Sequence, residues 1–209
     1  MRRKVIAGIC IVAGIALLAV PFFYKMHGKS ETDKLLKEFE QILEEDAYEK
    51  EVRQEKWEGD KASGSEEDTP LFLEENVIGI IEIEAIDIRL PIVEGTSSKD
   101  IAYAIGHMSE TAPIGEMGNC VLAGHNGSRN GVFFTNLNQL VLGDKVKLID
   151  RNGEVHLYEV ADMFIIGPYD NEVKAQGEEE ILTLLTCAEN GTKRYIVRCI
   201  LVGEGEWNE

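Results

Sequence analysis

The sequence lacks the patterns that mark several common classes of protein. It contains no Cys-x-x-Cys pair and no His-x-x-x-His pair, so it offers no recognisable zinc motif. The 209 residues carry a net charge of -17, and no basic patch offsets it, which argues against a nucleic-acid-binding surface. No internal repeat is evident. We therefore expect no metal, no cofactor and no nucleic-acid partner.

Charged side chains are missing from one long run near the N-terminus. Residues 5–24 carry no charge, and Arg2, Arg3 and Lys4 precede them. As a helix this run is about 30 Å long, enough to cross a bilayer core, and the basic residues predict a cytoplasmic N-terminus. A cleaved signal peptide is the alternative, but the run is long for one and lacks a good small-x-small cleavage site. We expect residues 1–24 to be a single-pass anchor in membrane lipid, with the rest of the chain outside the cell.

Residues 25–70 have the composition of a spacer, with 8 basic and 15 acidic side chains. Within it, apolar residues recur at helical spacing and predict a short amphipathic helix. These residues are Leu35, Leu36, Phe39, Ile42 and Leu43. Residues 61–70 show no such period and are predicted to be flexible. Two interpretations remain open: a solvated stalk, which we favour because charge runs usually form solvated faces, and a helix that covers a functional site.

Cysteine is scarce, with four residues in the chain. Cys10 lies in the apolar run, whereas Cys120, Cys187 and Cys199 lie in the region predicted to be extracellular. Three thiols cannot all pair with one another, so at least one stays free. A free thiol outside the cell needs a reason, and catalysis is one.

Residues 71–209 have the pattern of an all-β domain. Strands are predicted at about 77–84 and 86–94, and in "GNCVLAG", "KVKLID", "EVHLYEVADMFIIGP", "EILTLLTC" and "KRYIVRCILVG". Seven or eight short strands with little helix predict a barrel or a sandwich. Asn152-Gly153 predicts a type I′ hairpin turn. The polar connection 168–180 is either an ordinary surface loop or a ligand-binding loop.

The most informative pair is Cys187 and Arg194, which flank the turn signal Asn190-Gly191. If these two are the central residues of a tight hairpin, Cys187 stands directly opposite Arg194, on the same face and with Cβ atoms about 5 Å apart. A guanidinium beside a thiol favours the reactive thiolate but does nothing for a buried apolar cysteine. Alternation places Cys199 on the other face, as a small buried residue.

A nucleophilic thiol needs a proton partner, and the chain has four histidines. His27 lies in the spacer, and His156 lies in a plain strand, where we expect a surface or cross-strand position. His107 and His125 each follow a glycine at the end of an apolar stretch. We prefer His125, because a buried strand would deliver it to a glycine-rich loop, but His107 remains a competitor. Cys120 lies an odd number of residues from His125 and is predicted to be buried.

Three segments together resemble the sortases. "TLLTC", residues 183–187, and the arginine of "KRYIV" resemble the TLxTC…R signature of that family. "VLAGHNGSRNGVFFTNLNQLVLGD" resembles its histidine-bearing segment, and "GIIEIEAIDIRLPIVEGTS" resembles its opening strands. The likeness covers about residues 77–202. It implies a closed eight-stranded β-barrel and a cysteine transpeptidase that cuts an LPxTG-like sorting signal and joins it to an amine of the cell wall or of another surface protein.

The same resemblance implies the roles of individual residues. Cys187 would be the nucleophile, His125 the general acid/base, and Arg194 the group that holds the substrate and its oxyanion. Thr186 is expected to help form the oxyanion site. His107 matches a Gly-His pair that many relatives carry without a catalytic role. Class D members are the most similar and class C members second, although no class C lid motif is present.

Two other functions fit part of this pattern. A secreted thiol protease would use the same residues to hydrolyse peptides. A non-enzymatic, membrane-anchored β-module would leave Cys187 with a structural role. The favoured organisation is an anchor at 1–24, a charged stalk at 25–70 and a catalytic sortase domain at 71–209.

Overall fold

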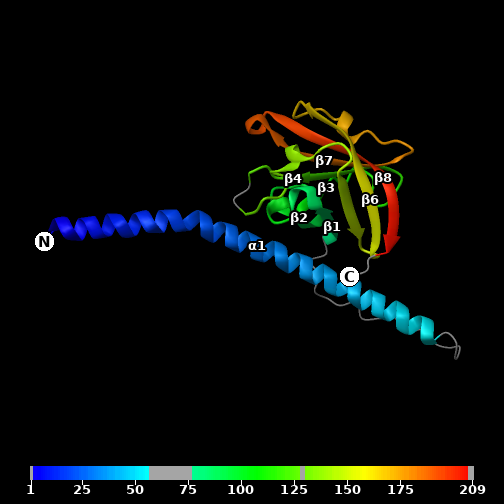
Figure 1. Ribbon diagram of the computed structural model, residues 1–209, viewed down its shortest axis with the longest axis horizontal. Coiled ribbons are helices and arrows are strands. Elements are labelled where there is room, and N and C mark those ends of the chain that lie inside the picture. Colours follow the sequence, from blue (N-terminus) through cyan, green and yellow to red (C-terminus); the bar gives the residue numbers. More distant parts are fainter. Residues whose placement is uncertain (1, 57–76, 128–129, 207–209) are drawn as a thin grey trace.

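The computed structural model describes residues 2–56, 77–127 and 130–206. One long helix precedes eight strands, which are joined by turns and short 3-10 helices (Figure 1). The helix is α1 (Arg2–Lys56). The strands are β1 (Val77–Ile83), β2 (Ile88–Glu94), β3 (Ile105–His107), β4 (Gly118–Gly124), β5 (Lys145–Asp150), β6 (Glu154–Ile166), β7 (Glu180–Ala188) and β8 (Lys193–Glu206). The 3-10 helices are η1 (Glu84–Ile86), η2 (Asp100–Ala102), η3 (Leu137–Gln139), η4 (Glu172–Lys174) and η5 (Glu189–Gly191).

The strands close into a barrel in the order β1-β2-β3-β4-β7-β8-β6-β5. β2 and β3 are parallel, as are β4 and β7, and the other neighbours are antiparallel. Of the two all-β architectures that the strand pattern allowed, the barrel is confirmed and the sandwich is wrong. Strand β3 was not predicted, because three residues are too few to show an alternating pattern.

The interior of the barrel is filled by apolar side chains from all eight strands, and the short strand β3 contributes Ile105. All seven residues of β4 are buried, which is why this stretch reads as an apolar run rather than as an alternation. Cys120 and Cys199 belong to this core, which confirms that both are small buried residues. Their fully buried neighbours include Ile81, Leu122, Leu148, Tyr158, Leu184 and Val197.

The turn between β5 and β6 differs from the type I′ turn that Asn152-Gly153 predicted. Of these two residues only Gly153 has a positive φ, 79°. The Gly153 amide donates to the Asp150 carbonyl over 3.2 Å, and the Asp150 carboxylate accepts from the amides of Asn152 and Glu154. Only the glycine is therefore left-handed, because the Asp150 side chain stabilises an ordinary right-handed turn before it.

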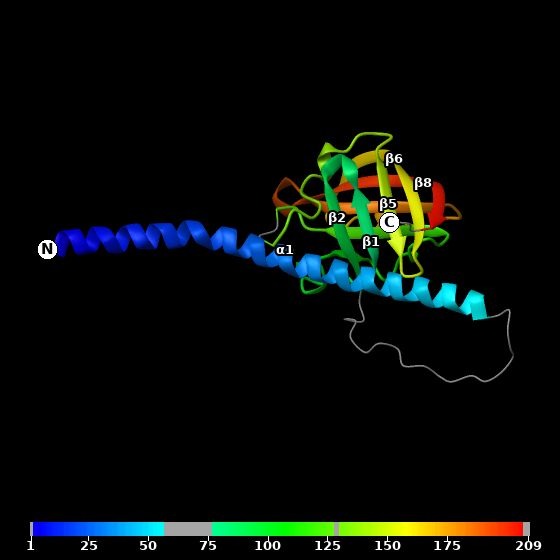
Figure 2. The same ribbon diagram turned by 60° about the horizontal axis from the view of Figure 1, so that its bottom comes forward.

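One face of α1 is buried against β1 and β2, while the N-terminal part of the helix extends beyond the barrel (Figure 2). Leu36, Phe39 and Leu43 are buried at this contact, which confirms the predicted apolar face, although the helix is one continuous element of 55 residues and not a short one. The contact differs from the solvated stalk that we favoured, because the apolar stripe of the helix packs on the barrel instead of facing water. The barrel residues that receive it are Val77, Ile80, Val93, Ala104 and Ile149.

Polar contacts fix the position of α1 along the barrel. The Thr32 hydroxyl donates to the Tyr103 carbonyl over 2.8 Å. Arg89 forms ion pairs with Glu40 of the helix and with Glu82 of β1. Gly28 packs so closely that a Cβ there would lie 1.9 Å from the Asn130 carbonyl oxygen. The helix thus meets the loops that follow β2 and β4 as well as the strands themselves.

Within the part of the chain that the structure describes, no helix combines the length and apolar character that a membrane span requires. The side chains of residues 2–13, within which the predicted anchor begins, lie outside that description. Residues 61–70, predicted to be flexible, also lie outside the described residues.

Candidate active site

Cys187 and Arg194 are direct partners in the antiparallel ladder of β7 and β8. The register prediction made from the sequence is therefore confirmed. Both side chains are partly exposed, at the end of the hairpin. Cys187 is a free thiol, in contrast to a cysteine that is locked in a disulfide. The hairpin alone thus brings a guanidinium-bearing strand alongside an accessible thiol.

The turn that joins these strands is longer than a two-residue hairpin turn. Asn190 and Gly191 have φ values of 57° and 88°, as predicted, and the Thr192 amide donates to the Glu189 carbonyl over 3.3 Å. Glu189 is also left-handed, with φ 48°, and the ladder ends at the Ala188–Lys193 pair. Because Glu189 and Thr192 leave the ladder together, the register below them is unchanged.

A second, parallel pairing brings His125 to the same end of the barrel as Cys187. Gly124 at the end of β4 lies beside Thr186 of β7, so His125 and Cys187 leave the barrel at the same end on adjacent strands. Gly124 leaves room for two core side chains, since a Cβ there would lie 2.7 Å from Ile105 Cδ1 and 2.8 Å from a ring carbon of Phe134. Topology therefore places His125, Cys187 and Arg194 together, although they come from three different strands or strand ends.

Two neighbours hold this arrangement in place. The Asn126 side-chain amide donates to the Cys187 carbonyl over 2.7 Å and ties the His125 loop to β7. The Thr186 hydroxyl is buried and donates to the Gly124 carbonyl over 2.8 Å, so it is engaged between β4 and β7. The sequence reasoning missed Asn126, whose only signal is its place directly after His125.

The Arg194 guanidinium is held over the turn. Its Nη1 donates to the carbonyl oxygens of Gly191 and Lys193, over 3.0 and 2.9 Å. These two bonds use one of the three guanidinium nitrogens. Lys193 in turn pairs with Glu189, 3.2 Å away, so the Glu189 carboxylate offsets the charge of Lys193. Arg194 therefore supplies the positive charge that stands directly opposite Cys187 in the ladder.

His107 occupies a different environment from His125. It is buried, with Nδ1 2.9 Å from a carboxylate oxygen of Glu94 and Nε2 3.0 Å from the Ala112 carbonyl. Both ring nitrogens therefore face acceptors inside the fold, and His107 sits beside Leu122 of β4, well before the strand end that carries His125. This arrangement favours a structural role for His107.

The other two histidines also lie away from the thiol. His27 is on an exposed part of α1 and makes an edge contact with Tyr103. His156 is opposite Glu204 in the β6–β8 ladder, so its predicted cross-strand position is confirmed, but it is buried rather than on the surface.

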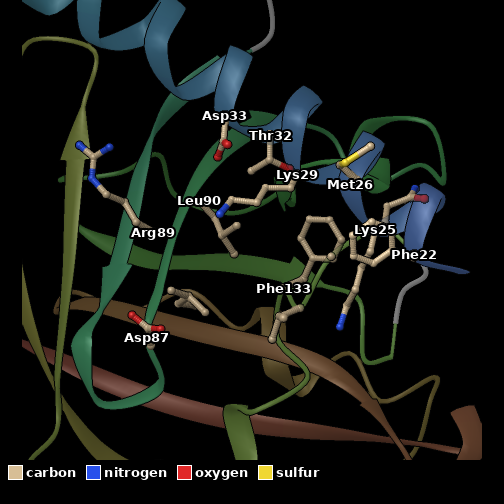
Figure 3. A pocket seen from close by; sticks show the side chains of 14 residues that line it. Phe22, Lys25, Met26, Lys29, Thr32, Asp33, Asp87, Arg89, Leu90 and Phe133 are labelled. Atoms are coloured by element: carbon tan, nitrogen blue, oxygen red, sulfur yellow. The ribbon is translucent and has the colours of Figure 1, made fainter. Parts of the chain in front are cut away.

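A cavity of about 500 Å³ lies between α1 and the barrel, close to the His125 loop (Figure 3). Phe22 and Met26 of α1 face Leu90 and Phe133 across it. Phe133 is buried and left-handed, with φ 42°, and its ring meets the His125 imidazole edge-on at 6.3 Å between centroids. Phe133 therefore contacts the His125 imidazole and also lines the cavity beside α1.

The loop between β6 and β7, which we predicted to be either a surface loop or a binding loop, is anchored at its centre. The side-chain amide of Asn119, on β4, donates to the carbonyls of Val173 and Ala175. The backbone amide of Asn119 donates to the side-chain oxygen of Gln176. Val173, the middle residue of η4, is buried. The segment is thus held to the barrel beside the strand that delivers His125.

Comparison with known proteins agrees with this geometry. The family model "Sortase domain" matches residues 81–202. Sortase A of Bacillus anthracis is 34% identical over 129 residues, which cover 61% of this chain and 60% of that protein. Sortase D of Bacillus subtilis strain 168 is 35% identical over 125 residues, covering 57% of this chain and 61% of that protein. The chain thus spans about three fifths of the length of these curated relatives.

Solved structures extend the comparison to the fold. A Clostridium perfringens sortase D5 transpeptidase aligns with a TM-score of 0.64 and 32% identity, over 83% of this chain and 99% of that one. Sortase C-1 from Actinomyces oris aligns with a TM-score of 0.58 and 30% identity, over 62% of this chain and 76% of that one. Since the family model alone covers more than half of the sequence, and the barrel assembles the expected cysteine, histidine and arginine, the chain belongs to the sortase family, whose members are cysteine transpeptidases.

Proposed function

We propose that this chain is a membrane-anchored sortase that cleaves an LPxTG-like sorting signal at its Thr-Gly bond and transfers the protein to an amine. The observation that carries the proposal is the double pairing around Cys187, with Arg194 opposite it on β8 and His125 beside it at the end of β4. The amine would belong to a cell-wall precursor or to a lysine of another surface protein. Similarity to sortases of class D supports placing the chain nearest to that class.

The first half of the reaction forms a thioester. The Cys187 thiolate attacks the carbonyl carbon of the substrate threonine, and negative charge develops on the carbonyl oxygen. Arg194 lies opposite Cys187 and offers planar N–H donors to that oxygen and to the substrate backbone. When the C–N bond breaks, His125 donates a proton to the departing glycine amine. Thr186 contributes by holding β7 to β4, because its hydroxyl is engaged by Gly124.

The second half of the reaction transfers the acyl group. An incoming amine attacks the thioester carbonyl, His125 accepts the proton that the amine loses, and the Cys187 sulfur leaves as thiolate. The enzyme returns to its starting protonation state, and one peptide bond has replaced another. Whether water competes with the amine decides between transpeptidation and simple hydrolysis by a thiol protease.

The anchor belongs to the same proposal. Residues 5–24 are uncharged and follow three basic residues, which supports a single-pass helix with a cytoplasmic N-terminus and an extracellular barrel. Membrane attachment would raise the effective concentration of substrates that are themselves tethered to the membrane.

The test is a reaction of the full chain, in detergent, with a panel of LPxTG-like peptides. Mass spectrometry would identify the products with and without added oligoglycine or lysine amines. We expect a covalent adduct at Cys187 and an amide product that appears only when the amine is present. Cys187→Ala is the matched control and should form neither. Hydrolysis alone, unchanged by any amine, would favour the protease, and no adduct with any peptide would favour the non-enzymatic module.

A further inference from the structure

A buried histidine at the far end of the barrel lacks a hydrogen-bond partner. His156 of β6 is only 4% exposed, and neither its Nδ1 nor its Nε2 makes a hydrogen bond. Burying an imidazole without satisfying either nitrogen is unfavourable, because each nitrogen gives up its contact with water. The site lies at the start of β7, whereas Cys187 lies near its end, so it is separate from the candidate active site.

Two carboxylates approach this imidazole. Glu204 is the direct cross-strand partner of His156 in the β6–β8 ladder. Glu180, the first residue of β7, places a carboxylate oxygen 3.8 Å from Nδ1, too far for a hydrogen bond but close enough for a shared ligand. One ligand atom from each of the three residues lies within 4.8 Å of the other two. Donors on three neighbouring strand ends therefore converge on one point.

The surroundings position these donors. The Tyr158 hydroxyl donates to a Glu180 carboxylate oxygen over 2.6 Å, in the manner of the outer hydrogen bonds that orient metal-binding carboxylates. Gly115 packs against the imidazole, and a Cβ there would lie 2.3 Å from its Cε1 atom. The His156 ring and the Glu180 carboxylate are thus held in place, while the exposed Glu204 side chain can change its conformation.

We infer that His156, Glu180 and Glu204 bind a divalent transition-metal ion of the zinc type. One imidazole and two carboxylates match zinc better than calcium or magnesium, which prefer oxygen ligands alone. Zinc-bound donor atoms at ~2.1 Å from the metal lie about 3.4 Å apart in a tetrahedral site, so the cluster needs to contract by roughly 1.4 Å or less.

The ion would satisfy His156, neutralise two carboxylates and join β6, β7 and β8. The three ligands are 24 residues apart in sequence, between 156 and 180 and again between 180 and 204, which explains why no short motif reveals them.

A second group, Asp150 and Glu154, also lies near His156. It is the weaker candidate, because the Asp150 carboxylate already accepts from the amides of Asn152 and Glu154. Removing the Glu154 carboxylate therefore serves as a control that distinguishes the two groups.

The test uses the untagged full chain, from which bound metal is first removed with a chelator. Zinc chloride is then titrated into the protein, and isothermal titration calorimetry measures the binding. A Cys187→Ala background removes the accessible thiol, which could bind zinc by itself. We expect one site per chain and a higher melting temperature with zinc. Glu204→Gln should weaken binding at least roughly tenfold, and His156→Gln more, whereas Glu154→Gln and the exposed Glu84→Gln should change it less than about twofold.

Glu204→Gln keeps the test decisive even if His156→Gln fails to fold, because Glu204 is exposed. The inference is overturned if zinc shows no saturable site, if Glu204→Gln binds normally, or if Glu154→Gln abolishes binding. It is also overturned if calcium chloride binds more tightly than zinc and His156→Gln leaves that binding unchanged. None of these outcomes bears on peptide cleavage, so the proposed function is tested separately.

Discussion

At the scale of single residues, the three cysteines of the barrel occupy contrasting environments. Burial raises the pKa of Cys199 to about 12 and raises that of Cys120 further, with the carboxylates of Glu94 and Glu180 adding to the effect for Cys120. Cys187 is partly exposed and is the direct ladder partner of the positively charged Arg194. Only one of the three thiols is therefore both accessible and placed beside positive charge.

These environments predict selective alkylation. At pH 8 the folded protein should take up iodoacetamide at Cys187 within minutes, while Cys120 and Cys199 stay unmodified, because both are buried and protonated at that pH. Peptide mass mapping of the folded and urea-unfolded protein measures the difference. Modification of Cys199 in the folded state, at a rate near that of Cys187, would contradict the burial described here.

The two Gly-His pairs predict opposite mutant phenotypes. His125→Ala should lower kcat about a thousandfold or more, because a proton donor is lost in the transition state. His107→Ala should change kcat only a few-fold, but it should lower stability by about 1–3 kcal/mol, because it leaves Glu94 and the Ala112 carbonyl without their buried partner. Steady-state kinetics and urea unfolding of both variants decide the matter, and equal kinetic losses would show that the wrong histidine was chosen.

Arg194 provides a test of geometry against charge. Arg194→Lys keeps the positive charge opposite Cys187 but loses the planar fork that can hold two oxygens at once. We expect Cys187 to remain reactive toward iodoacetamide in this variant, while peptide turnover falls at least about a hundredfold, or about 2.7 kcal/mol. Arg194→Ala is the reference. Near-normal turnover with lysine would mean that Arg194 acts as a charge only.

The residues of the site were predictable to the extent that one strand pair or one turn determines them. The Asn190-Gly191 signal and strand alternation were enough to pair Cys187 with Arg194. The position of Asn126 was not predictable, because it depends on the parallel pairing of β4 with β7, two strands far apart in the sequence. The same long-range pairing turns the Thr186 hydroxyl toward Gly124.

At the scale of elements, a charged network joins α1 to three strands. Glu82 of β1 accepts hydrogen bonds from Arg89 of β2 and pairs with Lys147 of β5 at 2.9 Å, and Arg89 also pairs with Glu40 of α1. Burial alone would raise the pKa of Glu82, but the bonds from Lys147 and Arg89 outweigh it and hold that pKa below its usual range. The carboxylate is therefore stabilised in the folded state.

This network predicts part of the acid sensitivity of the fold. A group whose folded pKa is depressed contributes stability above its unfolded pKa, near 4.5, and loses that contribution as the pH falls through the folded value. Glu82→Gln should therefore be less stable than the wild type at pH 7, and the difference should shrink below pH 4. Urea midpoints between pH 7 and pH 3 measure it, with the exposed Glu84→Gln as control. A difference that is constant across this range would contradict the assignment.

Elements were predicted better than their contacts. Helical spacing identified the apolar stripe of α1, but spacing alone does not say what covers the stripe, and the charge run favoured water. The structure shows the barrel covering it through Ile80 and Ile149. Similarly, the Asn152-Gly153 pair identified a turn, but the Asp150 side chain determined its type.

At the scale of the whole molecule, α1 links two regions of different character. Its N-terminal part, which coincides with the predicted anchor, lies away from the barrel, and its middle packs on β1 and β2 (Figure 1). Gly28 and Thr32 bring it against the loops that carry Asn130 and Tyr103. The helix therefore acts as a packed support for the barrel and not only as a connection to the anchor.

This dual role predicts that two truncations will behave differently. Removing residues 1–24 should leave a folded protein that cleaves peptides in solution at close to the full-length rate, because the packed residues Leu36, Phe39 and Leu43 are retained. In cells it should lose most of its activity on membrane-tethered substrates, since the high effective concentration supplied by a shared membrane is gone. Removing residues 1–70 should instead expose the apolar surface around Ile80 and Ile149, which lowers the melting temperature and promotes aggregation.

Three measurements on the two truncated proteins separate the loss of stability from the loss of membrane attachment. Circular dichroism melts report stability, peptide cleavage assays report activity in solution, and surface labelling of a sorting-signal reporter reports activity in cells. Phe39→Ala in the shorter truncation is the matched control. It should lose about 3–5 kcal/mol, because Phe39 is only 2% exposed and its removal leaves a cavity beneath the helix. If the protein lacking residues 1–70 is as stable as the one lacking residues 1–24, and Phe39→Ala has no effect, then α1 does not support the barrel. The solvated stalk would then be the correct description of residues 25–70.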